Sequence, residues 1–205
     1  MKNIMLSGPD GTGKSTIISA TQKKLEEIQI HTDIVWLRFH HYFAKLVNII
    51  GRITGKSYRE KYTWGEVGYH DYKGAIGVFY IIATYLDHQI FKFFIKNNKI
   101  KQNRFYLIDR YILDIVADLI VDTQNEKIVF FMFDKLVRNE LSNSKAFILE
   151  CDYDIVISRR EDIKDDKSYQ KKIDAYNLIS QRYNVKRLNT GENNIDEIVQ
   201  QILNS

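Results

Sequence analysis

A loop near the start of the chain has the residue types that bind phosphate. Residues 8–15 read Gly-Pro-Asp-Gly-Thr-Gly-Lys-Ser, which matches the pattern G-x-x-x-x-G-K-[ST] at every fixed position. An apolar segment that predicts a strand precedes the loop, and an amphipathic segment that predicts a helix follows it. Glycines let successive backbone N–H groups turn inward around phosphate oxygens, and the helix adds the positive end of its dipole. The sequence therefore predicts a site for a nucleoside triphosphate.

Two side chains at the end of this loop are expected to carry its chemistry. Lys14 can reach the β- and γ-phosphates, which makes it a candidate catalytic residue, and the Ser15 hydroxyl can bind Mg²⁺. The other loop residues expected to contact ATP are Gly8, Asp10, Gly11, Thr12, Gly13 and Thr16.

A second candidate site follows the hydrophobic segment that ends at Asp109. In open parallel sheets, ligands bind at the carboxyl ends of the strands, where this aspartate would lie. Asp109 is expected to hold the hydration shell of Mg²⁺, and Arg110 can meet a phosphate with two parallel hydrogen bonds. The alternative is that both residues only cap the next helix.

A third candidate is the charged segment 158–168, which follows the fourth predicted strand. Arg159 and Arg160 are expected to close over the triphosphate and to neutralise charge as the phosphoryl group moves. The alternative is a solvated helix end of mixed charge, which the carboxylates of the same segment favour.

The elements that must position these residues alternate between strands and helices. Nearly continuous apolar runs predict strands, and longer segments with helical spacing lie between them. The strands are expected at 2–7, 33–39, 104–109, 145–151 and 185–189, and three helices at 15–30, 74–96 and 126–141. This order predicts an α/β protein with three layers, in which helices flank a five-stranded, mostly parallel sheet. The single proline and the lack of a Gly/Ser-rich linker predict one domain over residues 1–205.

Composition excludes several classes of protein. The chain has 205 residues, of which 44% are hydrophobic and 27% charged, so a wholly disordered protein is excluded. Cys151 is the only cysteine, which excludes an internal disulfide and a cysteine-rich zinc site. The net charge of +4 suits anionic ligands but is too small to predict nucleic-acid binding. We find no signal peptide and no apolar run long enough for a membrane span, so we expect a cytoplasmic location.

The combined motifs resemble the thymidylate kinase family of nucleoside monophosphate kinases. The resemblance covers most of the chain and rests on the loop at residues 8–16, the Asp109-Arg110-Tyr111 sequence and the arginines of segment 158–168, a short lid in that family. It implies a P-loop NTPase fold and transfer of a phosphoryl group from ATP, with Mg²⁺, to dTMP.

The resemblance also implies roles for individual residues. Asp10 would lie near the acceptor nucleotide and act in catalysis, and Thr190 belongs to the stretch that lines the adenine site. Gly11 stands where one branch of the family has arginine, which implies that the catalytic arginine comes from segment 158–168. A homodimer packed through helices is implied as well, with apolar faces of residues 74–96 and 126–141 as candidates.

The acceptor half of the chain departs from the family pattern. The Arg-Glu-Pro-Gly signature is replaced by Leu-Arg-Phe-His-His at residues 37–41, and the arginine of the long helix is missing from residues 84–88. The remaining candidates for acceptor binding are Asp10, Arg38, Asp109 and Arg110, with residues 39–75 as an acceptor-side insertion. Two alternatives stay open: a kinase for another nucleotide, a nucleoside or a sugar phosphate, and a non-catalytic regulator that binds nucleotide.

Overall fold

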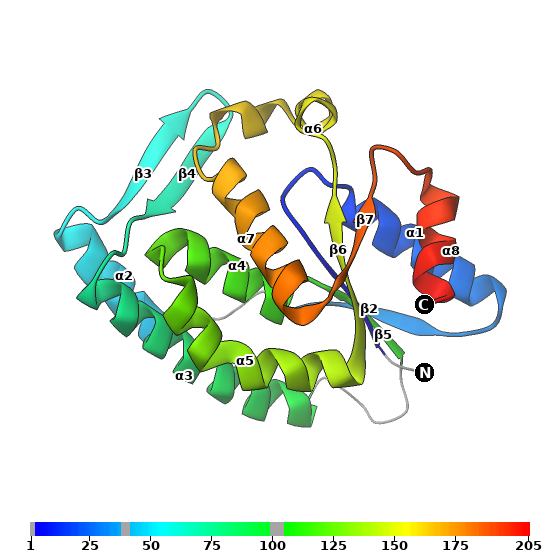
Figure 1. Ribbon diagram of the computed structural model, residues 1–205, viewed down its shortest axis with the longest axis horizontal. Helices are drawn as coiled ribbons and strands as arrows, with labels where there is room; N and C mark the ends of the chain where they lie inside the picture. Colours follow the sequence, from blue (N-terminus) through cyan, green and yellow to red (C-terminus); the bar gives the residue numbers. More distant parts are fainter. Residues whose placement is uncertain (1–2, 38–41, 99–104) are drawn as a thin grey trace.

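A parallel sheet forms the centre of the molecule (Figure 1). The computed structural model describes residues 3–37, 42–98 and 105–205, so Arg38 lies outside the described residues. Within them, five parallel strands are arranged in the order β2-β5-β1-β6-β7. The strands are β1 (Asn3–Ser7), β2 (Thr32–Trp36), β5 (Phe105–Asp109), β6 (Ser144–Glu150) and β7 (Lys186–Asn189). The predicted α/β class and all five predicted strands are confirmed.

Helices cover both faces of this sheet (Figure 1). On one face lie α1 (Lys14–Glu27) and α8 (Ile195–Leu203); on the other lie α3 (Ala75–Asn98), α4 (Ile112–Thr123), α5 (Glu126–Asn143) and α7 (Tyr169–Tyr183). Successive strand residues point to opposite faces. Ile4 and Leu6 therefore join the core beneath α1 and α8, while Met5 joins the larger core beneath the other helices. Burial on both faces explains why the inner strands β5, β1 and β6 are mostly apolar, whereas the edge strands β2 and β7 contain polar residues and are partly exposed.

The segment 39–75, expected to be an acceptor-side insertion, contains in its described part regular structure that its sequence pattern did not predict. It forms α2 (Phe43–Ile53) and a hairpin of β3 (Ser57–Tyr62) and β4 (Gly65–His70), which pair antiparallel. The hairpin stands apart from the central sheet (Figure 1). Most of its side chains stay at least partly exposed. Because little apolar surface is buried here, the strands lack the hydrophobic alternation by which strands are recognised in a sequence.

The helix segment 84–88, where the family arginine is missing, contains an aspartate with a structural role. Asp87 of α3 is fully buried, and its carboxylate accepts hydrogen bonds from the backbone N–H groups of Tyr42, Phe43 and Ala44 at 2.7–3.0 Å. These are orphan donors at the start of α2, where negative charge is favourable. Asp87 therefore fixes the insertion to α3.

The carboxyl ends of β1 and β5 place the first two candidate sites next to each other. Leu6 pairs with Asp109 in the register of the two strands, and the backbone N–H of Arg110 donates to the Leu6 carbonyl at 3.1 Å. The phosphate-binding loop and the Asp109-Arg110 pair therefore meet at one edge of the sheet. No helix within the described ranges is long and apolar enough to cross a membrane.

Candidate active site

The loop after β1 has backbone conformations that favour glycine. Gly8 has φ 143°, and both Gly11 and Gly13 have φ 80°. A Cβ on Gly8 would lie 2.3 Å from the carbonyl oxygen of Leu149 in β6, a distance that no side chain tolerates. The first glycine is thus required by the close approach of the loop to β6, and Gly13 starts α1 in the left-handed region.

Lys14 lies inside this loop with its amino group surrounded by carbonyl oxygens. Its Nζ donates to Gly8 O at 2.8 Å and to Pro9 O at 2.5 Å, and the residue is 7% exposed. Burial, followed by the positive charge of Arg110, lowers the pKa of Lys14 to about 8. A bound phosphate would reverse this shift because it brings negative charge to the ammonium. The site is therefore organised for an anion.

Asp109 has the features of a magnesium-shell ligand and none of those of a helix cap. Its Oδ1 is buried, and no described residue gives it a hydrogen bond. Burial raises its pKa above the ordinary value, although Arg110 and Lys14 act in the opposite direction. A carboxylate that lacks a donor, together with the Ser15 hydroxyl after the loop, fits the oxygen ligands that Mg²⁺ prefers.

In the described ranges, no three His, Cys, Asp or Glu side chains group together as they would around a metal held by protein alone.

Arg110 and Asp10 form an ion pair across the mouth of the loop. Arg110 adopts a left-handed backbone conformation, with φ 57°, which is uncommon for a residue with a side chain. Burial alone would raise the pKa of Asp10, but Arg110, Lys14 and Lys172 together hold it below its ordinary value. The guanidinium therefore stands beside the loop with its charge intact, in reach of a second anion.

Asp114 supports this arrangement and was missed in the sequence analysis. Its carboxylate accepts hydrogen bonds from Ser7 Oγ at 2.7 Å, the Tyr111 backbone N–H at 3.0 Å and Tyr176 Oη at 2.7 Å. It is Asp114, and not Asp109, that caps α4, and it joins the end of β1 and the start of α4 to the middle of α7. A carboxylate three residues after the first capping position is the spacing of a capping box, which is the signal that could have identified it.

Thr190 connects the loop to the segment after β7. Its hydroxyl lies 3.0 Å from Thr12 O and accepts a hydrogen bond from Arg159 Nη1 at 3.2 Å. Arg159 Nη2 also donates to Thr190 O at 3.0 Å. A methyl group on Gly13 would lie 3.8 Å from Arg159 Nη1, so this guanidinium stands over the start of α1. The structure thus brings Thr190 and Arg159 together beside the phosphate-binding loop.

The contacts of Arg160 differ from those of Arg159. It forms an ion pair with Asp162 of the short 3₁₀ helix η1 (Glu161–Asp165), which follows α6 (Tyr153–Arg159). Its pKa is raised, first by the hydrogen bond to Asp162 and in part by Asp10, and Arg110 acts against this. The partner of Arg160 is therefore Asp162, with a smaller influence of the Asp10–Arg110 pair, whereas Arg159 lies at Thr190.

The segment 158–168 is anchored to the hairpin on the far side of the site. Trp64 Nε1 donates to Asp165 Oδ2 at 2.8 Å, and Lys167 Nζ pairs with Glu60 at 2.7 Å. The Tyr69 hydroxyl lies 3.3 Å from Asp165 O. The segment is thus neither a purely solvated helix end nor an extended loop. It is folded and bridges to the β3–β4 hairpin.

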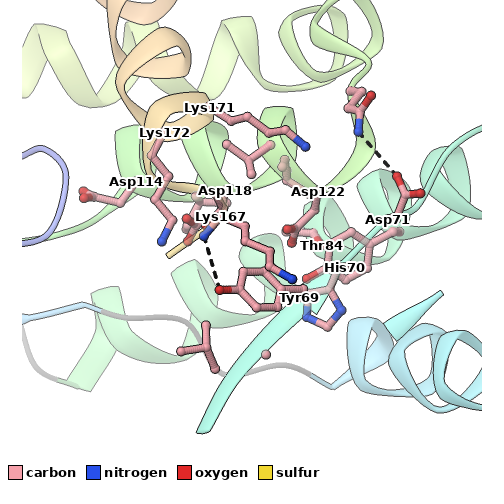
Figure 2. Close-up of a pocket in the computed structure, with 18 of the residues that line it drawn as sticks. Tyr69, His70, Asp71, Thr84, Asp114, Asp118, Asp122, Lys167, Lys171 and Lys172 are labelled. Carbon is pink, nitrogen blue, oxygen red and sulfur yellow. Dashed lines mark hydrogen bonds between the residues drawn. The ribbon is translucent and has the colours of Figure 1, made fainter. Parts of the chain in front are cut away.

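A cavity of about 530 Å³ opens next to Arg110, between α3, α4, α7 and the hairpin (Figure 2). This volume is within the range of small-molecule sites. Aspartates of α4 and lysines near the start of α7 face each other in it: Asp114, Asp118, Asp122, Lys167, Lys171 and Lys172. Lys172 pairs with Asp166 at 2.9 Å. The cavity continues the site from the phosphate-binding loop toward the insertion.

Comparison with known proteins gives a match in structure and none in sequence. No sequence-family model matches the chain, and no curated protein sequence matches it either. The thymidylate kinase from Candida albicans superposes with a TM-score of 0.56 over 99% of this chain and 89% of that chain, at 18% identity. This is a thymidylate kinase fold. The thymidylate kinase from Ehrlichia chaffeensis gives a TM-score of 0.54 at 14% identity, with 99% and 97% of the chains covered. The likeness confirms, at the level of the fold, the resemblance that the motifs indicated.

Proposed function

We propose that this protein transfers the γ-phosphoryl group of ATP, with Mg²⁺, to the phosphate of a nucleoside monophosphate. The observation that carries the proposal is the position of Arg110. Its guanidinium stands between the phosphate-binding loop, where Lys14 lies, and a cavity large enough for a nucleotide. A donor triphosphate and an acceptor phosphate would therefore meet at one cluster of positive charge.

The proposed roles follow from this geometry. Lys14 would stabilise charge on the transferring phosphoryl group, and Arg110 would hold the acceptor phosphate in line with it. Arg160, on the Asp10 side, is the better candidate for contact with the moving group. Arg159 and Thr190 would border the donor nucleoside. Asp10 would orient Arg110 rather than remove a proton, because a phosphate oxygen is already ionised near neutral pH.

Bound magnesium would neutralise charge on the donor phosphates, and Ser15 and Asp109 are the residues that would hold it. The segment 158–168 would serve as the lid that excludes water, since it already contacts both Thr190 and the hairpin. The resemblance names dTMP as the acceptor, which makes dTMP the reference substrate. The Candida albicans enzyme is described as having broad substrate specificity, so this fold can house more than one acceptor.

Release of ADP with and without monophosphates tests the proposal. We expect release to depend on the acceptor and to fall by orders of magnitude in Lys14→Ala, which removes a preorganised charge from the reacting group. Slow, acceptor-independent hydrolysis would instead indicate a nucleotide-dependent regulator. Near-normal turnover in a folded Lys14→Ala protein would contradict the role of the loop.

A further inference from the structure

A row of hydrogen-bond acceptors runs along one wall of the cavity, from beside Arg110 to the far end. Asp114, Asp118 and Asp122 follow one another at intervals of one turn on α4, and all three line the cavity (Figure 2). Asp122 lies about 12 Å farther along the helix axis than Asp114, at 1.5 Å per residue. The cavity therefore has the Arg110 guanidinium at one end and the Asp122 carboxyl group at the other, which we call the acidic end.

A buried hydroxyl at this acidic end has no partner. Thr84 of α3 is 3% exposed and lines the cavity, and its Oγ1 makes no hydrogen bond to any described residue. Buried hydroxyl groups in native proteins are almost always paired, with protein or with something bound. Figure 2 shows Thr84 close to Asp122 in the same part of the cavity. Two polar side chains thus face a space that a ligand would fill.

The Asp122 carboxyl group has no hydrogen bond from the described residues either, and its charge is poorly compensated. Burial and the neighbouring Asp118 raise its pKa well above the ordinary value, while Lys172 acts in the opposite direction. Lys172 is itself paired with Asp166. A ligand that donates N–H groups to Asp122 would relieve this situation, because N–H donors stabilise the ionised carboxylate.

Nucleobases differ in what they can offer to such a carboxyl group. Cytosine and adenine present an exocyclic amino group beside a ring nitrogen acceptor, and guanine presents an amino group in the same way beside a ring N–H. Carboxylates read cytosine through its amino group. Thymine and uracil present a carbonyl oxygen at that position, which an ionised carboxylate repels and only a protonated carboxyl group could bond. A base bound to the ionised form of Asp122 is therefore an amino base and not an oxo base.

We infer that the acceptor is a nucleoside monophosphate whose base carries an exocyclic amino group, read by Asp122 and Thr84 at the end of the cavity opposite Arg110. This inference rests on the proposed function and departs from the dTMP that the resemblance implies. Sites built to bond a substrate N–H reject analogues that lack it by large factors, because their own buried groups are left unpaired.

Pairs of acceptors in which an oxo group replaces the amino group provide the test. We expect kcat/KM for at least one amino member to exceed that of its oxo partner at least tenfold: dCMP against dUMP, with dTMP as its 5-methyl analogue, CMP against UMP, AMP against IMP, or GMP against XMP. Asp122→Asn supplies a neutral amide that can also donate to a carbonyl, so the preference should fall close to unity. Thr84→Val, which is similar in shape, should weaken acceptor use while the KM for ATP stays unchanged.

Asp174→Asn is the matched control, since Asp174 is an exposed carboxylate on the outer side of α7 bonded only by Gln170, and it should leave the preference unchanged. If Asp122 has only a structural role, Asp122→Asn would lower kcat/KM equally for both members of a pair. That result would overturn the inference. Equal or better use of dTMP or UMP by the native protein would also overturn it, while the kinase function would stand.

Calorimetric binding of the same monophosphates separates the two proposals. If no acceptor is phosphorylated but dCMP, CMP, AMP or GMP binds at least tenfold more tightly than its oxo partner, the inference holds and the kinase function fails. If no monophosphate binds, both are wrong.

Discussion

The positive charge of Arg110, at the centre of the site, influences the protonation of Lys14. Lys14 and Arg110 lie close enough that the arginine helps to lower the lysine pKa, while Asp10 compensates both. In the absence of ligand, Lys14 is therefore half protonated at about pH 8. An incoming triphosphate supplies the charge that this group of residues lacks.

Binding of ATP should consequently take up a proton at alkaline pH. With a pKa of about 8 in the free protein, Lys14 is charged at pH 6.5 and mostly neutral about one unit above that pKa. Bound phosphate restores the charge, so we expect close to one proton to be taken up near pH 9 and almost none near pH 6.5. Calorimetry of Mg·ATP binding in two buffers of different ionisation enthalpy measures this. Uptake that persists in Lys14→Ala would assign the proton to another group.

Binding of the acceptor phosphate should depend on the planar shape of the Arg110 guanidinium as well as on its charge. Arg110→Lys keeps the charge but loses the two parallel hydrogen bonds, a loss of about 1.5–3 kcal/mol for a charge-assisted contact. We expect kcat/KM for the acceptor to fall at least about tenfold, while ATP binding measured alone changes little. An equal loss in ATP affinity would indicate that Arg110 contacts the donor nucleotide and not the acceptor.

At the scale of elements, the segment 158–168 is held in place by packing as well as by ion pairs. Val156 and Ile163 are buried together with Tyr169 in a small separate core. A Cβ on Gly11 would lie 2.6 Å from Val156 Cγ1 and 2.8 Å from Ile163 Cδ1, so the phosphate-binding loop is itself part of this contact. The absence of a side chain at Gly11 is what lets the segment close onto the loop.

Gly11→Ala should therefore displace this segment without unfolding the protein. The new methyl group clashes with α6 and η1, and the left-handed backbone at φ 80° adds about 1–2 kcal/mol of strain. We expect a lower Tm and at least a tenfold lower kcat, together with faster proteolytic cleavage within residues 158–168. Gly74→Ala is the control, since Gly74 has a similar left-handed backbone, with φ 68°, but nothing lies within 4 Å of an added Cβ. Normal turnover in Gly11→Ala would show that closure of the segment is not needed.

The sequence predicted the central sheet and the donor half of this site, and both follow from local signals. Strands buried on both faces are mostly apolar, and the phosphate-binding loop is a contiguous motif. The hairpin was missed because its strands bury little surface. Asp118 and Asp122 were missed although they stand at helical spacing in an apolar helix. They form a candidate site only together with Thr84, which is distant in the sequence and lines the same cavity in the fold.

At the scale of the whole molecule, two helices leave apolar stripes exposed. On α3, Phe79, Leu86 and Phe93 are 65%, 45% and 68% exposed and recur at intervals of seven residues, that is, on one side of the helix. On α2, a similar set is exposed: Phe43, Leu46, Ile49, Ile50 and Ile53. In α5, the other helix expected at an interface, Phe131 is the large apolar residue among those described as exposed. Exposed apolar surface of this extent is typical of an interface.

We therefore expect a homodimer formed through α3 together with α2. Phe79→Glu and Leu86→Glu place a charge in the stripe, and light scattering should show a shift from dimer to monomer at the same protein concentration. Ile28→Glu is the control, since Ile28 is 57% exposed at the end of α1, on the opposite face of the sheet (Figure 1). A native protein that is monomeric at micromolar concentration would contradict this interface.

Transfer of γ-labelled phosphate from ATP tests the central claim most directly. The protein is incubated with Mg²⁺, labelled ATP and each nucleoside monophosphate in turn, and the products are separated by chromatography. We predict label in a nucleoside diphosphate, formed in equal amount with ADP and absent without acceptor or in Lys14→Ala. Label released only as inorganic phosphate, at a rate that no monophosphate changes, would contradict the claim.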